Sequence, residues 1–224
     1  MKLAIVGYGK MGRMVEQLAP EFGFSVHATL DVGDSISKAK GADVAIEFST
    51  PSSVVENIEK LAELGIPTVI GTTGWLQHLS SVRETVENHG TGLVWSPNFS
   101  IGVNVFFRLV QEAAILLKDE NEYGAWAWEI HHDSKKDAPS GTLIKLVEEM
   151  KLSGYGRPID VNSNRAGKHP GTHEIGFDSA ADTITLRHSA RSREGFARGA
   201  LKAAKWIPGK TGVFRFEEVL FEKR

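Results

Sequence analysis

The sequence contains no cysteine, which excludes disulfide bonds, thiolate metal sites and a cysteine nucleophile. It also lacks an excess of either charge, because 26 lysine and arginine residues nearly balance 28 aspartate and glutamate residues, for a formal net charge of −2. The basic residues form no extended stripe along the chain. We therefore expect no nucleic-acid partner and no attraction to an anionic membrane.

Long hydrophobic runs are absent as well. The first apolar stretch, residues 3–6, is far too short for a membrane span or for the hydrophobic region of a signal peptide. We therefore expect no membrane insertion and a cytoplasmic location. The 224 residues, of which 41% are hydrophobic and 24% are charged, are typical of a globular protein with one large domain or two small ones.

The first hundred residues alternate between strand and helix patterns. Apolar stripes at helical spacing predict helices over residues 11–18, 54–64 and 76–86. Short apolar or alternating runs predict strands at 2–6, 24–30, 44–48, 68–70 and 92–95. Strands separated by helices of this length indicate an α/β fold, with a mostly parallel sheet covered on both faces.

Beyond about residue 100 the pattern becomes α+β. Helices are expected over residues 103–117, 142–151 and 196–207. Strands are expected at 126–130, 159–162, 172–177 and 182–188. No linker rich in proline, glycine or serine separates the two parts, so the boundary follows only from this change of pattern.

A glycine motif follows the first strand. Gly7-Tyr8-Gly9-Lys10-Met11-Gly12 has the form GxGxxG and opens the first helix. Its first glycine permits a tight turn, its second lets the backbone approach a pyrophosphate, and its third lets the helix lie close to the strand. Free N–H groups at the helix start favour phosphates. We predict a dinucleotide site; the alternative is a turn that only packs a helix on a sheet.

The residue that ends the second strand bears on which dinucleotide binds. Asp31 lies about 20 residues after the glycine motif, where a carboxylate can accept both ribose hydroxyls of NAD. It would repel the additional phosphate of NADP. The pattern therefore favours NADH, while Lys38 and Lys40 keep NADPH open if their loop folds inward.

Three further loops follow strands of the same sheet. They contain Phe48-Ser49-Thr50-Pro51, Gly71-Thr72-Thr73-Gly74 and Ser96-Pro97-Asn98-Phe99-Ser100. Ligands bind beyond the carboxyl ends of parallel strands, although each loop taken singly could only cap a helix. We predict cofactor contacts at Ser49, Thr50, Gly71, Thr72, Thr73, Pro97, Asn98 and Phe99.

The densest group of reactive side chains runs from Glu129 to Thr142, between a strand end and a helix start. His131, His132 and Lys135 place three proton donors or cations in one loop. Ser140-Gly141-Thr142 adds hydroxyls and N–H groups at the helix start, which suits an anion. The segment therefore indicates a substrate that carries carboxylates.

A zinc site is the alternative interpretation of this segment. His131, His132 and Asp133 could bind the metal together with His169 or His173. Adjacent histidines on a strand point to opposite faces, which argues against joint ligation. We therefore expect no metal.

The string from His131 to Thr142 resembles the signature of the dihydrodipicolinate reductase family, His-His-x-x-Lys-x-Asp-Ala-Pro-Ser-Gly-Thr, at every fixed position. The resemblance covers nearly the whole chain. It includes the glycine motif, the loops at residues 71–74 and 97–100, and the segment 192–200.

The resemblance implies roles for individual residues. His131 matches the proposed proton donor, and Lys135 matches a lysine that binds substrate and can itself supply the proton. His132 matches a substrate contact, and Arg193 matches an arginine near the site. The group that binds the substrate carboxylate is matched by Ser140, Gly141 and Thr142.

The resemblance also implies an architecture and a reaction. Residues 1–100 and 194–224 would form a Rossmann-type dinucleotide-binding domain. Residues 101–193 would form a smaller α+β domain for substrate binding and for assembly into a homotetramer.

The implied reaction is the NAD(P)H-dependent reduction of dihydrodipicolinate, a small cyclic imine with two carboxylates, to tetrahydrodipicolinate in the diaminopimelate route of lysine biosynthesis. Two alternatives stay open: a related dehydrogenase for another carboxylated imine or amino acid, and an NAD(P)-binding sensor without catalysis.

Overall fold

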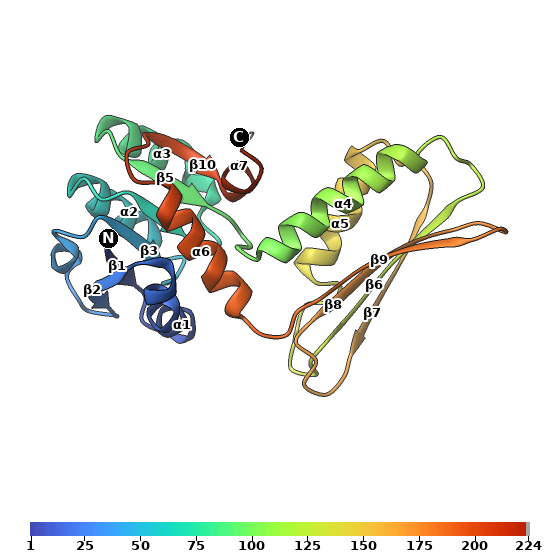
Figure 1. The fold of residues 1–224 in the computed structure, drawn as a ribbon, viewed down its shortest axis with the longest axis horizontal. Coiled ribbons are helices and arrows are strands. Elements are labelled where there is room, and N and C mark those ends of the chain that lie inside the picture. The colour runs from blue at the N-terminus through green and yellow to red at the C-terminus, as the bar shows by residue number, and fades with distance from the viewer. Residues whose placement is uncertain (223–224) are drawn as a thin grey trace. The chain divides into compact units, whose positions relative to one another are not determined.

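The structure, a computed structural model, describes residues 1–222. It divides into two compact units (Figure 1). The first unit contains Met1–Ile101 and the chain from Arg193 onward, and the second contains Gly102–Ser192. Each junction lies one residue from the boundary expected from the sequence, so that Ile101 and Arg193 belong to the first unit. Residues 223–224, part of the expected segment 194–224, lie outside the described residues.

The first unit is built on a parallel sheet with the strand order β10-β5-β4-β3-β1-β2. The chain runs from β1 to β2 on one side and then returns to β3 on the other side of β1. This reversal creates the switch point at which open α/β sheets bind ligands. The strands are β1 (Lys2–Val6), β2 (Ser25–Leu30), β3 (Val44–Glu47), β4 (Thr68–Ile70), β5 (Gly92–Trp95) and β10 (Gly212–Arg215).

Helices cover both faces of this sheet. On one face the core includes Leu3 and Ile5 from the sheet and Val15 and Ala200 from α1 and α6. On the other face Ile58 of α2 and Val82 of α3 lie in a second cluster with residues of β4 and β5. The helices are α1 (Lys10–Leu18), α2 (Val54–Glu63), α3 (Leu79–Asn88), α6 (Glu194–Trp206) and α7 (Phe216–Phe221), with short 3-10 helices at Ala19–Phe22, Ile36–Ala39 and Leu76–His78.

The α/β fold predicted from the sequence is confirmed, but β10, α7 and the 3-10 helices at Ala19–Phe22 and Ile36–Ala39 were not predicted. Strand β10 and helix α7 follow the last helix that the sequence predicted. Strand β10 has only four residues and lies at the sheet edge beside β5. Its residues are only partly buried or exposed, so β10 lacks the continuous apolar run that predicted the comparably short β4 and β5.

The second unit contains a four-stranded mixed sheet in the order β7-β6-β8-β9. Strands β6 and β7 are parallel, and the other pairs are antiparallel. Helices α4 (Ile101–Leu117) and α5 (Gly141–Leu152) cover one face of the sheet (Figure 1). The strands are β6 (Gly124–His131), β7 (Ile159–Arg165), β8 (Thr172–Asp178) and β9 (Thr183–Ser189).

Alternation along β6 separates a buried face from a more exposed one. Ala125 and Ala127 point into the apolar core, which also contains Ile175 and Phe177 of β8. Glu129 and His131 continue the same face toward the end of the strand, where polar residues replace the core. The covered face of this sheet therefore changes from apolar to polar along its length.

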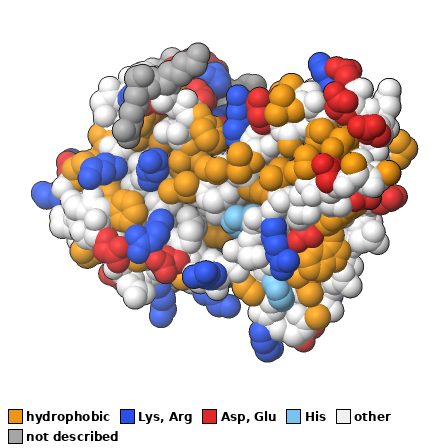
Figure 2. Space-filling model, turned by 45° about the vertical axis from the view of Figure 1, so that its right-hand side comes forward, with side chains coloured by type: hydrophobic (Ala, Val, Ile, Leu, Met, Phe, Trp, Pro, Cys, Tyr) orange, Lys and Arg blue, Asp and Glu red, His pale blue; other side chains and the backbone are white. Residues whose placement is uncertain are grey.

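The described residues carry surface charges of both signs and no helix suited to a bilayer. Basic and acidic side chains are interspersed on the face drawn in Figure 2, as the near-zero net charge leads one to expect. Within residues 1–222, no helix combines the length and the hydropathy that a bilayer span requires.

Candidate active site

The glycine motif forms a tight turn between β1 and α1. Gly7 has a φ of +88°, and a Cβ there would lie 2.3 Å from the Phe48 carbonyl oxygen. A Cβ on Gly12 would lie 2.4 Å from the Gly7 carbonyl oxygen, so α1 could not approach the turn. A Cβ on Gly9 would meet nothing within 4 Å. Packing therefore requires glycine at positions 7 and 12, whereas position 9 faces open space.

That open space belongs to a cleft of about 430 Å³ at the carboxyl ends of β1, β3 and β4. The start of α1 lies at its edge, and Gly9 caps this helix without a side-chain hydrogen bond. Free N–H groups at a helix start attract phosphate, so the cleft fits a dinucleotide. It is lined by Gly9, Lys10, Met11, Phe48, Ser49, Pro51, Gly71, Thr72 and Thr73, of which all but Phe48 and Pro51 were predicted to bind the cofactor.

Asp31 lies just beyond β2 and does not line this cleft. Its carboxylate accepts a hydrogen bond from the Val32 N–H at 2.9 Å, and its own N–H donates to Asp34 at 2.9 Å. Lys38 forms an ion pair with Asp34. The carboxylates of Asp31 and Asp34 therefore stabilise the turn after β2 through these hydrogen bonds. The contact of Asp31 with a cofactor ribose stays a prediction.

The loop after β5 also stands apart from the cleft lining. The Ser96 hydroxyl donates to the Asn98 carbonyl at 2.8 Å, and the Asn98 side chain accepts from the Ser100 N–H at 2.9 Å. The Phe99 ring is buried and packs on Phe216, with ring centroids 4.8 Å apart. Any cofactor contact of Phe99 would therefore involve its main chain, and the contacts predicted at 97–99 stay predictions.

A buried glutamate next to the cleft had no assigned role in the sequence analysis. Glu47 ends β3, is fully buried, and accepts hydrogen bonds from the Ser49 N–H at 3.1 Å and the Asn57 amide at 3.3 Å. Burial raises the pKa of this carboxyl group. The hydrogen bond from the Ser49 N–H holds the start of a loop that lines the cleft, so Glu47 stabilises the position of that loop.

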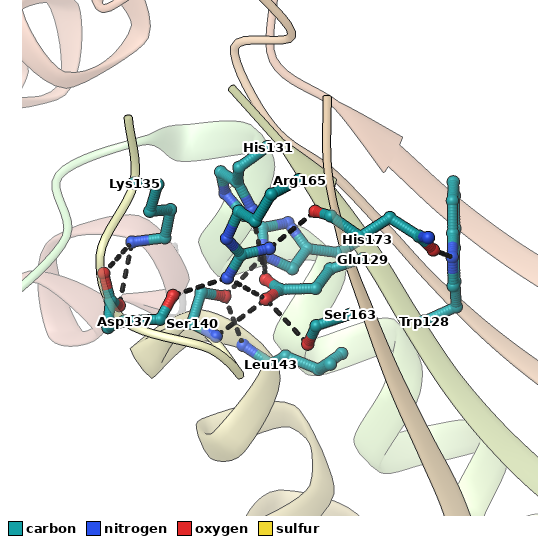
Figure 3. A network of polar contacts seen from close by, with 11 residues as sticks. Trp128, Glu129, His131, Lys135, Asp137, Ser140, Leu143, Ser163, Arg165 and His173 are labelled. Atoms are coloured by element: carbon teal, nitrogen blue, oxygen red, sulfur yellow. Dashed lines mark hydrogen bonds and ion pairs between the residues drawn. The ribbon is translucent and has the colours of Figure 1, made fainter. Parts of the chain in front are cut away.

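The polar centre of the second unit is Glu129 on β6, which is fully buried (Figure 3). Its Oε1 accepts hydrogen bonds from the Ser140 N–H at 2.8 Å, the Ser163 hydroxyl at 3.0 Å and the Arg165 guanidinium at 2.9 Å. Burial alone would raise the pKa of Glu129, but the bonds from Ser140, Arg165 and Ser163 outweigh it and lower this pKa to about 2. The carboxylate is therefore ionised at any physiological pH.

Two histidines lie on the other oxygen of this carboxylate. Glu129 Oε2 is 3.2 Å from His131 Nδ1 and 3.3 Å from His173 Nε2. Burial lowers the pKa of His173 to about 4. Burial also lowers the pKa of His131, where the Glu129 charge opposes the shift and the cations Lys135 and Arg165 add to it. Both rings are therefore neutral at pH 7.

These three side chains could also chelate a metal, because their ligand atoms all lie within 4.8 Å of one another. The Arg165 guanidinium competes for the same carboxylate at 2.9 Å, and a cation there opposes a second one. We therefore assign no metal to the cluster. Among residues 1–222 the zinc set considered from the sequence does not assemble, since the cluster contains neither His132 nor Asp133 nor His169.

The loop that follows β6 carries the predicted cations. Lys135 Nζ lies 2.6 and 2.8 Å from the two carboxylate oxygens of Asp137, and the Lys135 side chain is 22% exposed. The His132 Nδ1 and the Ser134 hydroxyl are 2.8 Å apart. Lys135 therefore already holds a carboxylate, which shows that it can reach an anion in this loop.

The start of α5 completes the group. Ser140 caps the helix by accepting from the Leu143 N–H at 3.2 Å, and its hydroxyl lies 3.1 Å from His173 Nε2. The N–H group and the hydroxyl group of buried Ser140 thus both contact other groups of the protein. Gly141 and Thr142 are more exposed, so a substrate carboxylate would meet these two residues first.

Arg193 lies in the first unit, at the start of α6. Its predicted substrate contact stays a prediction. No role was predicted from the sequence for Glu129, Ser163 or Arg165, and His173 was named there as a candidate zinc ligand. Strand alternation signals that Glu129 and His131 share a face, but the pairing that brings β7 and β8 beside them is visible only in the fold.

Comparison with known proteins identifies the family. Residues 1–99 match the family model described as the N-terminus of dihydrodipicolinate reductase, and residues 102–220 match its C-terminus. A 4-hydroxy-tetrahydrodipicolinate reductase of Christiangramia forsetii is 37% identical over 98% of both chains. One from Methanoregula boonei is 36% identical over 89% of this chain and 82% of its own.

Solved structures show the same fold. A dipicolinate-bound dihydrodipicolinate reductase from Paenisporosarcina sp. TG-14 has a TM-score of 0.81 at 23% identity, covering 96% of this chain and 97% of that one. An amine dehydrogenase from Mycobacterium smegmatis has a TM-score of 0.65 at 8% identity, covering 97% and 95%. The resemblance seen in the sequence is confirmed: the chain belongs to the dihydrodipicolinate reductase family of NAD(P)H-dependent oxidoreductases.

Proposed function

We propose that this chain reduces 4-hydroxy-tetrahydrodipicolinate, by way of dihydrodipicolinate, to tetrahydrodipicolinate in the diaminopimelate route of lysine biosynthesis. The observation that carries the proposal is the family match over both halves of the chain, together with the complete string from His131 to Thr142. A relative that carries the reductase name is 37% identical over 98% of both chains. As a biosynthetic enzyme, the protein is expected to act in the cytoplasm.

The first unit is the proposed dinucleotide-binding domain. Gly7, Tyr8, Gly9, Lys10, Met11 and Gly12 would hold the pyrophosphate at the start of α1, and Ser49, Thr50 and residues 71–73 and 97–99 would surround the rest of the cofactor. The open side of Gly9 and the adjacent cleft support this placement. When bound, NAD(P)H supplies the hydride that adds to the substrate.

NADH is the proposed preferred cofactor. Asp31 directly follows β2, whose last residue, Leu30, accepts a hydrogen bond from the Gly7 N–H of the glycine turn, and the Asp31 charge would repel a 2′-phosphate. Lys38 is already paired with Asp34, so it does not offer a free cation to that phosphate. The two observations support NADH over NADPH.

The second unit is the proposed substrate-binding and assembly domain. Lys135, His132 and the first turn of α5 would bind the two carboxylates of the cyclic imine. The contact between Lys135 and Asp137 supports this, because it places a carboxylate against the same lysine. Arg193 is the further proposed substrate contact.

Addition of hydride leaves electron density on the ring nitrogen and the adjacent carbon of the substrate, and a proton must complete the step. His131 and Lys135 are the two candidates for this acid. Burial lowers the pKa of His131, so the free protein holds this ring neutral. A bound dianion would favour the charged imidazolium and raise this pKa again. Lys135 can also stabilise the developing negative charge.

A homotetramer is the proposed assembly. The sheet of the second unit leaves the face opposite α4 and α5 without a covering helix of its own unit (Figure 1). Trp126 and Trp128 lie on that face, with Trp126 over Gly176, where a Cβ would come within 2.1 Å of the indole. An uncovered face with large aromatic rings suits pairing with another copy of the chain. Sedimentation equilibrium tests the stoichiometry.

A coupled assay tests the reaction. A dihydrodipicolinate synthase supplies substrate in the cuvette, and NADH oxidation is followed by absorbance, with an omitted synthase as the control. Turnover that depends on the synthase supports the proposal. Activity only with keto acids and ammonia would indicate the related dehydrogenase, and cofactor binding without any oxidation would indicate the sensor.

A further inference from the structure

Glu129 occupies the point where three strands and one helix of the second unit meet. The registers of the sheet place Ser163 on β7 and His173 on β8 directly beside it. The start of α5 lies against the same carboxylate through the Ser140 N–H. The two oxygens divide the surroundings between them: Oε1 accepts three hydrogen bonds, and Oε2 faces two imidazoles (Figure 3).

The His131 ring lies against this carboxylate. Its Nδ1 is 3.2 Å from Glu129 Oε2, but neither of these buried atoms makes a hydrogen bond among the described residues, so the contact has the distance of a hydrogen bond without its angle. A proton on Nδ1 has Oε2 as an acceptor once the ring turns toward it. The opposite nitrogen, Nε2, lies beside Gly171, where a Cβ would come within 2.8 Å of it. A side chain at position 171 would therefore clash with Nε2.

The other contacts of Glu129 keep its carboxylate charged, so that Oε2 can accept a hydrogen bond. The Ser140, Ser163 and Arg165 donors all bind Oε1, and they hold the carboxylate in its charged form. His173 lies 3.3 Å from Oε2, and its ring packs edge-on against His131, with centroids 5.1 Å apart. The charged or titratable groups that act on His131 are Glu129, Lys135, Arg165, His132 and the neighbouring His173, and only Glu129 favours the imidazolium.

We infer that Glu129 is a positioning residue for the reduction: its Oε2 accepts the Nδ1 proton of His131, so that Nε2 is the nitrogen that exchanges a proton with the substrate. The inference rests on the proposed function, in which His131 acts on the substrate. In the proton-transfer step, the Nε2–H bond of the imidazolium breaks and a bond from this proton to the reduced substrate forms. The ring is left neutral, with its remaining proton on Nδ1 facing Glu129.

The variant that tests this is Glu129→Gln. Glutamine keeps one carbonyl oxygen for Ser140, Ser163 and Arg165, but it replaces Oε2 with an NH₂ group that cannot accept from His131. We expect kcat to fall about 10- to 100-fold, part of the 10²- to 10⁴-fold that proton transfer contributes, while KM changes much less. Because the Glu129 charge favours the imidazolium, the pH limb that reports His131 should move to lower pH.

A nitrogen-15 NMR measurement on the intact protein reads the imidazole tautomer without substrate. In the wild type the neutral His131 ring should carry its proton on Nδ1, and in Glu129→Gln the proton should move to Nε2. The His131→Asn spectrum assigns the signal among the eight histidines. Glu174→Gln is the matched control, because Glu174 lies next to His173 on β8 but pairs with Arg187 instead. It should leave both the tautomer and kcat unchanged.

Two results would overturn the inference. One is a His131 tautomer that stays the same in Glu129→Gln. The other is a kcat within about twofold of the wild type, which would make Glu129 a structural partner of Arg165 only. Failure of the proposed function looks different, because the wild type would then not turn over the substrate while the NMR signal still reported the tautomer.

Discussion

Replacing Arg165 with methionine isolates the electrostatic part of the Glu129 cluster. The Arg165 guanidinium lies 2.9 Å from Glu129 Oε1, and its side chain is only 17% exposed. The pKa of Glu129 is lowered from 4.5 to about 2, and a shift of this size corresponds to about 3 kcal/mol of stability at pH 7. Three donors share this effect, and a charge-assisted bond contributes about 1.5–3 kcal/mol. We therefore expect Arg165→Met to lower the free energy of unfolding by about 2 kcal/mol at pH 7.

The sign of the pH dependence follows from the depressed pKa. A carboxyl group whose folded pKa lies below its unfolded pKa stabilises the fold above the unfolded value, and this stabilisation is lost as the pH falls through the folded value. For Glu129 that window runs from 4.5 down to about 2. At pH 3 less than half of the contribution remains, so the deficit of Arg165→Met should shrink to about 1 kcal/mol.

Urea unfolding at pH 7 and pH 3, followed by circular dichroism, measures both values. Arg187→Met is the matched control, because Arg187 pairs with Glu174 at 3.2 Å but its side chain is 57% exposed. Exposed pairs contribute about 0–1 kcal/mol, so this variant should differ little from the wild type. A deficit of Arg165→Met that is equally large at pH 3 and pH 7 would refute the electrostatic account and leave only lost packing.

Three further predictions concern the proposed function. His131→Ala and Lys135→Ala should each lower kcat by about 10²- to 10⁴-fold and leave the NADH dissociation constant nearly unchanged, as stopped-flow and fluorescence titration would show. Asp31→Ala should weaken NADH binding more than NADPH binding, and an equal loss of both in calorimetric titration would contradict ribose recognition. Gly9→Ala should keep its melting temperature yet bind NADH more weakly, whereas Gly12→Ala should melt earlier because its Cβ meets the turn.

The sequence predicted most of the first unit because its signals are local. Strands β1, β3, β4 and β5 are largely buried, so each appears as a short apolar run, and the helices between them carry clear stripes. The glycine turn could be placed for the same reason: a motif of six consecutive residues needs no knowledge of pairing. Strand β10 was missed because its partly buried residues form no continuous apolar run, and α7 and the 3-10 helices at Ala19–Phe22 and Ile36–Ala39 were missed as well.

The polar centre of the second unit could be predicted only in part. His131, Lys135 and Ser140 lie within ten residues of one another, so one stretch of sequence contains them. Ser163, Arg165 and His173 come from other strands, and a shift of one residue in the sheet register would turn their side chains to the opposite face. Without the register, Glu129 appears as an ordinary acidic residue rather than as the carboxylate that these strands surround.

The loop between β6 and α5 also shows how its cations hold an anion. The Asp137 carboxylate lies against Lys135 Nζ, and the pKa of Asp137 is lowered chiefly by this lysine, with a smaller effect of the Gly141 N–H. Lysine and helix start therefore act together on one carboxylate, as proposed for the substrate. Because the Asp137 side chain is 57% exposed, moving it into water costs little, and an incoming dianion can take its place on Lys135.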